Sequence, residues 1–225
     1  MSDALKAMPE SPLHPFGLSA RAAAPAPHNR VVMSELGNLG YLVLRGKAID
    51  EAFMQAVAGR LGQPLPTQPM TVLRTDAGVV LWISPDEWLL VCKRSARDGL
   101  LAELSTALKD VFAQVVDNSG GLTALRLAGP DHMLLLRQLG PYNFEGLAVG
   151  RCAATVASKT GFTVVRTDTA GVVLVFRRSF ADYTWRLLEH TAQPYRPCIT
   201  TPAQCADPFF TPLFTPLFTP LPETV

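Results

Sequence analysis

The sequence predicts an α+β fold built from two similar halves with largely antiparallel sheets. Short apolar runs of strand length follow one another and are flanked by helical segments, without the regular strand–helix alternation that is typical of a parallel sheet. The order strand, helix, three strands, helix also occurs twice between residues 40 and 192. We therefore expect two pseudo-repeated βαβββα units packed together.

Composition divides the chain into three segments. Residues 1–38 combine alanines with prolines at positions 9, 12, 15, 25 and 27, which predicts an extended arm. Residues 39–192 form the predicted α+β domain, with halves at about 39–113 and 114–192. Residues 193–225 contain a Phe-Thr-Pro-Leu repeat, and proline at every fourth position there excludes a helix or a central strand.

We expect the segment 193–225 to be a disordered or polyproline-like tail. A terminal extension is favoured over a motif that docks in a groove, because chain termini tolerate change best. Deletion of residues 198–225 is therefore expected to leave stability and assembly unchanged.

The first half begins with a strand at Tyr41–Arg45 that Gly46 closes. Asp50 then opens a helix whose apolar residues follow the helical period, and Gly62 ends it. Three further strands and a second helix are expected at Met70–Arg74, Val79–Ile83, Trp88–Lys93 and about Ala96–Val111.

A tight corner, Ser84-Pro85-Asp86-Glu87, joins two of these strands. Proline fixes its own φ and pushes the preceding residue out of the helical region, which is typical of a turn. Trp82 and Trp88 flank the corner and are expected in the core or at an interface. Asp86 and Glu87 are adjacent, so in an extended chain they point to opposite faces, which is poor geometry for shared acid–base chemistry.

The second half repeats the pattern. Residues 115–121 lead into a strand at Leu122–Leu127, and Pro130-Asp131 open a helix that Gly140-Pro141 end. Three strands and a last helix follow at Cys152–Ala157, Phe162–Arg166, Val172–Phe176 and Phe180 to about His190.

Charge and cysteine usage exclude several classes of protein. Twenty basic and nineteen acidic residues give a net charge of +1, which does not support a nucleic-acid or anionic-membrane partner. Apolar runs fall short of the ~20 residues of a membrane span, and residues 1–10 lack the apolar region of a secretory signal. Cys92, Cys152, Cys198 and Cys205 form no metal-binding pattern, so we expect reduced thiols in a cytoplasmic protein.

Candidate catalytic and binding residues do not form a recognisable site. Gly120-Gly121 could cradle a phosphate, but the pair precedes a strand instead of a helix, so a structural role is favoured. His14 and His28 fall in the predicted arm, His132 stands beside Asp131 in a first helical turn, and His190 ends a helix. We therefore assign no catalytic, cofactor-binding or metal-binding residue.

Several stretches of the chain form a recognisable set. They are Ser11-Pro-Leu-His-Pro15, Leu44-Arg-Gly46, Leu61-Gly62 with Leu65-Pro66, the corner within Leu81–Leu90, and Asp117-Asn-Ser119 before Leu125–Asp131. Together these stretches resemble the gamma subunit of heterotetrameric sarcosine oxidase. The corner, with its Pro-Asp-Glu-Trp motif, is the most specific of them. The resemblance covers about residues 11–192 and excludes the tail.

That family is similar in turn to the folate-binding fold of the glycine-cleavage aminomethyltransferase, which implies the same fold here. In the transferase a carboxylate follows a Gly-Gly pair and meets the folate. The matching stretch Thr160–Arg166 has Val164 and Val165 where the acid would stand. Folate binding and catalysis are therefore not carried over to this chain.

The resemblance implies an accessory, non-catalytic subunit. Its alpha, beta and delta partners would hold FAD, covalent FMN, NAD, zinc and tetrahydrofolate. Their complex demethylates sarcosine oxidatively to glycine, with hydrogen peroxide and either formaldehyde or 5,10-methylenetetrahydrofolate as products. The alternative is a stand-alone folate or one-carbon-binding protein of the aminomethyltransferase-like fold.

Overall fold

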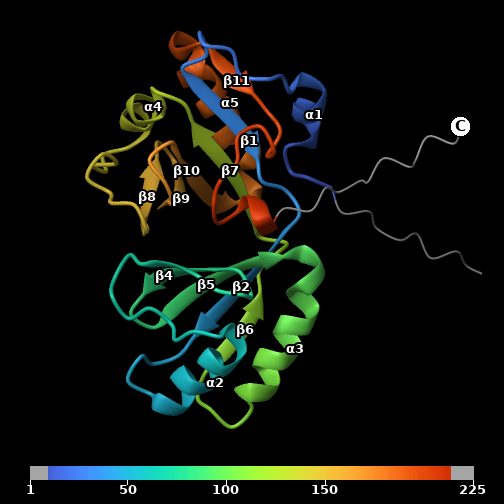
Figure 1. Ribbon diagram of the computed structural model, residues 1–225, viewed down its shortest axis with the longest axis vertical. Coiled ribbons are helices and arrows are strands. Elements are labelled where there is room, and N and C mark those ends of the chain that lie inside the picture. The colour runs from blue at the N-terminus through green and yellow to red at the C-terminus, as the bar shows by residue number, and fades with distance from the viewer. Residues whose placement is uncertain (1–9, 214–225) are drawn as a thin grey trace, which may run out of the picture.

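The computed structural model describes residues 10–213. Two sheets stack face to face, and the helices cover their two outer faces, so the layers run helix, sheet, sheet, helix (Figure 1). All strand pairs between the named strands of this region are antiparallel except one. The predicted α+β class is confirmed.

The first sheet follows the strand order β3-β4-β5-β2-β6. Its strands are β2 (Leu39–Arg45), β3 (Val72–Arg74), β4 (Val79–Ser84), β5 (Glu87–Lys93) and β6 (Gln114–Asp117). Helices α2 (Glu51–Leu61) and α3 (Arg97–Ala107), the latter after the 3-10 turn η2 (Arg94–Ala96), cover its outer face. Asp50 caps α2 by accepting the Phe53 amide at 3.2 Å, and Gly62, at φ 75°, ends the helix as predicted.

The second sheet follows the order β11-β1-β7-β10-β9-β8. Its strands are β1 (Val31–Glu35), β7 (Leu122–Ala128), β8 (Arg151–Ala157), β9 (Thr160–Arg166), β10 (Gly171–Arg177) and β11 (Pro197–Ile199). Three helices lie over its outer face: α1 (Leu18–Arg21), α4 (His132–Leu139) and α5 (Ala181–Ala192). The other 3-10 turns of the described residues are η1 (His14–Phe16), η3 (Arg178–Phe180), η4 (Gln193–Tyr195) and η5 (Thr211–Leu213).

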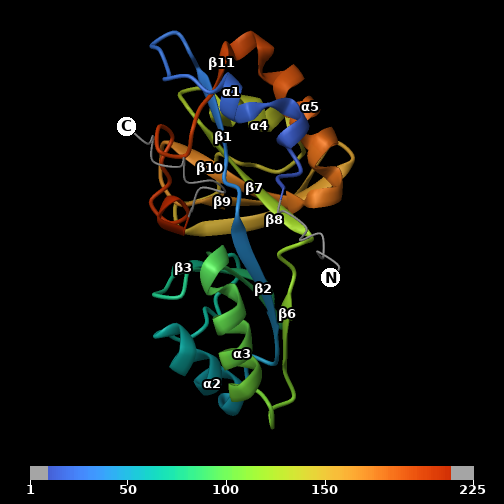
Figure 2. The same cartoon turned by 90° about the vertical axis from the view of Figure 1, so that its right-hand side faces the viewer.

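The two sheets share a strand order. β3-β4-β5-β2 in the first sheet occupy the same sequence of positions as β8-β9-β10-β7 in the second. Each sheet then continues with a strand from the other part of the chain. β1, which precedes β2 in the chain, pairs with β7 in the second sheet, and β6, which precedes β7, pairs with β2 in the first sheet. The chain therefore crosses between the sheets twice, from β1 to β2 and from β6 to β7 (Figure 2).

This exchange corrects the predicted boundaries. Residues 31–35 were expected in the extended arm, but they form β1, whose residues 31–34 are buried. The prolines that precede this short strand concealed it. β6 belongs to the first sheet, so the structural break falls after Asp117, whereas the sequence placed it between residues 113 and 114.

The predicted disordered tail is wrong for residues 193–213. β11 pairs in parallel with β1, and Asp207, Phe210 and Leu213 are buried. Pro212 lies within the short turn η5, a position that proline tolerates because few backbone donors are needed there. The rest of the tail, residues 214–225, lies outside the described residues.

The inner faces of the two sheets form a core that we call the seam. It contains Leu36, Leu39, Tyr41, Val72, Val79, Leu81, Leu89, Val91, Ala124, Cys152, Val165, Val173, Val175, Phe210 and Leu213. Backbone hydrogen bonds join the sheet edges on one side, from Val72 N to Gly150 O at 2.9 Å and from Cys152 N to Met70 O at 2.7 Å. The seam therefore includes both sheets and the segment that follows β11.

Candidate functional site

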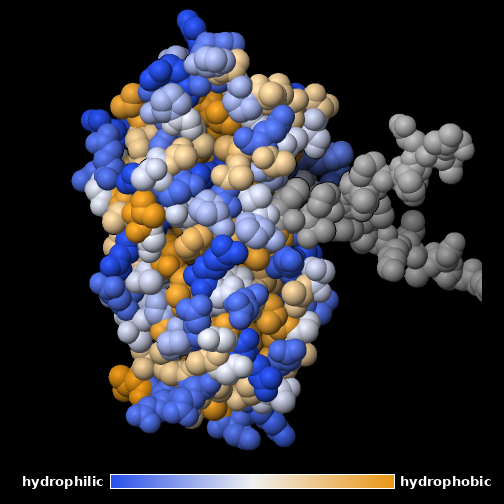
Figure 3. Space-filling model, in the orientation of Figure 1, coloured by the Kyte–Doolittle hydropathy of each residue, from blue (hydrophilic) through white to orange (hydrophobic). Residues whose placement is uncertain are grey.

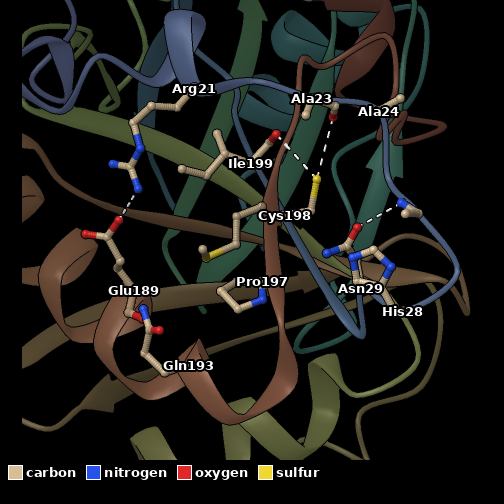
Figure 4. Close-up of a pocket in the computed structure, with 12 residues that line it drawn as sticks. Arg21, Ala23, Ala24, His28, Asn29, Glu189, Gln193, Pro197, Cys198 and Ile199 are labelled. Carbon is tan, nitrogen blue, oxygen red and sulfur yellow. Dashed lines mark hydrogen bonds and ion pairs between the residues drawn. The ribbon is translucent and has the colours of Figure 1, made fainter.

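One cavity lies between the N-terminal arm, the end of α5 and strand β11, and we call it the arm pocket. Its volume is about 470 Å³, and its lining includes Arg21, His28, Asn29, Glu189, Gln193 and Cys198 (Figure 4). The arm reaches this position because Ala23 N donates to Ile199 O at 2.9 Å and Arg30 N donates to Tyr195 O at 3.0 Å. Segments from the two ends of the chain thus build the pocket.

Several polar side chains of the arm pocket already have ion-pair or hydrogen-bond partners within the protein. Arg21 and Glu189 form an ion pair across its mouth (Figure 4). The Asn29 amide accepts from Ala26 N at 2.8 Å and donates to Arg196 O at 3.0 Å. Burial raises the pKa of the Cys198 thiol, which disfavours the thiolate needed for nucleophilic chemistry. The pocket can hold a small molecule, but these groups offer it no activated nucleophile.

A second cavity, which we call the linker pocket, lies beside the two chain crossings. It measures about 230 Å³, and its lining includes Glu35, Tyr41, Arg94, Ser119, Gly120 and Arg178. Burial raises the pKa of Glu35, although a hydrogen bond from Ser11 and the charge of Arg178 oppose the shift. The pKa of Tyr41 is also raised, by burial and by the charge of Glu35, so its hydroxyl stays protonated.

The glycine pair in the linker pocket has a structural role, as the sequence favoured. Gly121 N donates to Asn118 O at 2.9 Å, and Ser119 Oγ accepts from Tyr41 N at 2.9 Å. The Ser119 hydroxyl also donates to Asp117. The turn therefore fastens one chain crossing to the other, since Tyr41 follows the first crossing and Ser119 belongs to the second.

A buried ion cluster connects the second sheet to the segment after β11. Arg126, in the middle of β7 and 1% exposed, donates to Asp207 and makes a two-point contact with Asp168 at 2.7 and 2.8 Å. Asp207 also accepts from Thr167. The sequence analysis missed this cluster. Its one available signal was an arginine inside an apolar strand, because a buried cation requires a partner.

The histidines are not brought together. His14 is exposed beside Glu10 at 3.3 Å, His28 lines the arm pocket, and His190 lies in the last turn of α5. His132 is buried with Nδ1 2.6 Å from Gly129 O, and burial lowers its pKa. Within residues 10–213 no three His, Cys, Asp or Glu side chains are grouped to hold a metal ion.

The acidic corner contacts a single cation. Arg45 lies 3.0 Å from Asp86 and 3.4 Å from Glu87. The two acids were expected to point apart if the chain were extended there, but Asp86 lies in the turn, so that condition does not hold. An exposed ion pair of this kind gives the corner a structural role.

The position expected to carry an acid in the transferase fold is apolar on both faces. Val164 and Val165 are completely buried. Val164 faces the helix-covered core of the second sheet, whereas Val165 faces the seam. Burial raises the pKa of Cys152, which is paired with Val165 across β8 and β9, to about 12 and that of Cys92 in β5 to about 11, which disfavours the thiolate at both positions.

None of the helices in residues 10–213 has the length and apolar character required to cross a membrane.

Comparison with known proteins gives consistent matches. Residues 45–193 match the model of the sarcosine oxidase, gamma subunit family. The chain is 31% identical over 174 residues to sarcosine oxidase subunit gamma of Arthrobacter sp, which covers 72% of this chain and 85% of the relative. The same subunit of Corynebacterium sp. (strain U-96) is 29% identical over 177 residues, covering 77% of this chain and 85% of that one.

Solved structures give the same result. A chain of the heterotetrameric sarcosine oxidase from Corynebacterium sp. U-96, in complex with pyrrole 2-carboxylate, superposes with a TM-score of 0.75 at 27% identity over 84% of this chain and 97% of that chain. Aminomethyltransferase T of the glycine cleavage system from Bartonella henselae gives a TM-score of 0.63 at 15% identity, over 85% of this chain and 59% of that one. This second likeness concerns the fold alone.

Proposed function

The chain belongs to the sarcosine oxidase gamma subunit family, and from this premise we propose that it is a non-catalytic, structural subunit of a heterotetrameric sarcosine oxidase. The observation that carries the proposal is the match to a chain of that heterotetramer, which extends over 97% of the matched chain. A likeness of nearly full length supports a shared place in the assembly as well as a shared fold.

The proposed complex contains alpha, beta and delta subunits beside this chain. Those subunits would carry FAD, FMN, NAD, zinc and the tetrahydrofolate site. The reaction consumes sarcosine, water and oxygen and yields glycine, formaldehyde and hydrogen peroxide, or it transfers the one-carbon unit to give 5,10-methylenetetrahydrofolate. We place the complex in the cytoplasm.

The chemistry of the cavities supports a non-catalytic role. In the arm pocket the Arg21 and Glu189 charges pair with each other, and the Cys198 thiol is held protonated by burial. In β9, the buried Val164 and Val165 occupy the position where the related transferase is expected to use an acid. A general base or nucleophile needs an accessible group with a matched pKa, and these positions do not supply one.

Two exposed apolar residues support contact with a partner subunit. Ile49 is 89% exposed and Phe112 is 90% exposed. Their loops lie at the same end of the first sheet, because Arg45 and Gln114, which adjoin those loops, are paired across β2 and β6. Elsewhere on the face shown in Figure 3, apolar residues form small areas separated by hydrophilic ones. We propose that this end of the first sheet contacts a large subunit.

Co-expression tests the proposal. The chain purified alone is expected to be colourless and inactive toward sarcosine. Flavin absorbance and sarcosine-dependent peroxide formation are expected to co-elute with it only when the large subunits are expressed alongside. The matched control is the set of large subunits expressed without this chain. Flavin binding or sarcosine oxidation by the isolated chain would contradict the proposal.

Calorimetry separates this role from that of a stand-alone folate-binding protein. An unpaired ring donor of a buried pterin costs about 1–3 kcal/mol, so a fold with Val164 and Val165 in place of the acid should recognise the ring poorly. We expect no heat when tetrahydrofolate is titrated into the isolated chain. A dissociation constant in the low micromolar range would favour the folate-binding alternative.

A further inference from the structure

One tetrapeptide of the chain's own C-terminal region contributes two buried side chains to the seam. Phe210 is completely buried and Leu213 is 8% exposed, and both pack among apolar side chains of the two sheets. The 3-10 turn η5 (Thr211–Leu213) follows Phe210 directly, and Leu213 N donates to Phe210 O at 3.0 Å. Two apolar side chains three positions apart therefore enter the seam from a single turn.

Asp207 and Thr211 hold this turn in place. The Asp207 carboxylate accepts from the backbone amides of Phe209 at 2.9 Å and Phe210 at 3.0 Å. In return, Asp207 N donates to the Thr211 hydroxyl at 2.6 Å. The amides that enter the apolar seam are thus paired within the segment itself, which is the condition for burying them without a large cost.

The described part of the chain includes only the first copy of this tetrapeptide. The sequence reads Phe-Thr-Pro-Leu at residues 210–213, 214–217 and 218–221. The second and third copies lie outside the described residues, whereas the seam that holds the first copy is formed once. The sequence therefore carries three copies of the unit, and the described residues place the first of them in the seam.

The residues around each copy also match the docked copy in chemistry. Three positions before the phenylalanine stands Asp207 in the first copy and Thr211 in the second, and both residue types cap the amides of a following turn. One position before the phenylalanine stands Phe209, which packs against the seam, or Leu213, which is also apolar. The second copy thus has the same features, apart from the charge of Asp207.

We propose that the seam is a peptide-binding groove for a Phe-Thr-Pro-Leu unit, and that residues 214–217 of the same chain are an alternative occupant. When the second unit replaces the first in the groove, the register of the chain shifts by four residues. The four extra residues then form a loop between Asp207 and the docked unit. The first unit is preferred because only there can Asp207, while it stays bound to Arg126 and Thr167, also cap the amides of the docked turn. This inference is independent of the proposed function.

Rescue by the spare units tests the exchange. F210A/L213A is made in the full chain and in a chain that ends at Leu213. We expect a clearly smaller loss in melting temperature in the full chain, because residues 214–217 refill the groove. Adding F214A/L217A/F218A/L221A should abolish that rescue. The unsubstituted chain ending at Leu213 is the matched control, and it should melt like the full chain.

Equal losses in the two lengths of chain, or failure of both substituted chains to fold, would overturn the exchange. The rescue could instead grow with protein concentration and be accompanied by a dimer in ultracentrifugation. The groove would then be filled by residues of a second copy, and the proposed exchange within one chain would be overturned. Folding of only the long substituted chain counts as rescue.

A peptide titration tests the groove directly. The fluorescently labelled peptide Phe-Thr-Pro-Leu-Phe-Thr-Pro-Leu is titrated into the full-length chain in which all three units carry alanine for phenylalanine and leucine. We expect saturable binding, and no binding of a control peptide with alanine at the same positions. Equal behaviour of the two peptides would overturn the proposal that the seam recognises this unit.

Discussion

Arg126 and Asp207 form a buried ion pair between residues 81 positions apart in the chain. Both are at most 1% exposed. The pair joins the middle of β7 to the segment that follows β11. It also places the capping carboxylate of Asp207 where it can accept the Phe210 amide at 3.0 Å. One contact therefore fastens the tail segment and orients the turn that enters the seam.

Removal of the cation should destabilise the fold strongly. We expect Arg126→Met to lower the free energy of unfolding by about 3–5 kcal/mol, because the buried Asp207 loses its charged partner. Arg186→Met is the control, since Arg186 pairs with Asp182 on the surface and should have little effect. Urea denaturation compares the variants. Equal urea midpoints for the parent and Arg126→Met would show that the buried pair contributes nothing to stability.

Replacement of both partners should cost less than replacement of one. In Arg126→Met/Asp207→Asn the completely buried carboxylate at position 207 is removed together with its cation, so part of the lost stability should return, although the partly exposed Asp168 still lacks its partner. Strict additivity of the two single substitutions in the same urea experiment would indicate that Arg126 and Asp207 act independently.

Truncation should separate the docked part of the tail from the rest. The sequence analysis expected deletion of residues 198–225 to leave stability unchanged, but the structure buries Phe210 and the Arg126–Asp207 pair. We now expect that deletion to lower the melting temperature substantially, whereas a chain ending at Leu213 keeps every described contact. Overlapping melts of the longer deletion and the parent would contradict the packing of this segment.

Although it did not predict strand β6 (Gln114–Asp117), the sequence predicted most elements between residues 40 and 192, because most have a clear period of their own. The helix from Asp50 to Gly62 is an example, with apolar spacing inside and a cap at either end. β1 and β11 were missed for a physical reason. Both are short, both adjoin prolines, and they are stabilised by pairing with each other and with β7, contacts that no local pattern encodes.

The buried cluster and the cavities were even less accessible to sequence reasoning. Arg126 inside an apolar strand signals a buried partner, but nothing near it in the chain identifies that partner as Asp207 or Asp168. The arm pocket likewise depends on contacts between segments from opposite ends of the chain, such as Arg21 with Glu189. Predictions about the corner were local, and the structure buries Trp88 as they expected.

Trp88 should be a major contributor to the core of the first sheet. Its ring is completely buried, its centroid lies 5.6 Å from that of Phe53, and its indole nitrogen donates to Pro66 O at 2.8 Å. We expect Trp88→Ala to cost about 3–5 kcal/mol of stability. The control is Trp82→Ala, at a partly buried position directly across the strand pair, which should cost less. A Trp88→Ala melt that overlays the parent's would rule out this role.

Glu35 should make the folded state less stable as the pH rises. Burial raises its pKa above the usual 4.5, so the folded chain holds this proton more tightly than the unfolded chain does. Stability must then fall as the pH rises from the usual value through the raised one. Glu35→Gln is neutral throughout, so it should melt above the parent at about pH 7, and the difference should be smaller at about pH 4. If the melting temperatures of the parent and Glu35→Gln differ by the same amount at every pH, Glu35 is not the titrating group.

The exposed end of the first sheet should matter for assembly and not for folding. Ile49 and Phe112 are 89% and 90% exposed, so serine at both positions removes few contacts within the chain. Burial of such side chains against a partner contributes about 1.5–3 kcal/mol each. We therefore expect Ile49→Ser/Phe112→Ser to keep the parent's melting temperature but to recover much less large subunit on co-purification. Val149→Ser is the matched control, because Val149 is 49% exposed and precedes β8 in the other sheet. If the double variant recovers as much large subunit as the control does, this end of the sheet is not the contact surface.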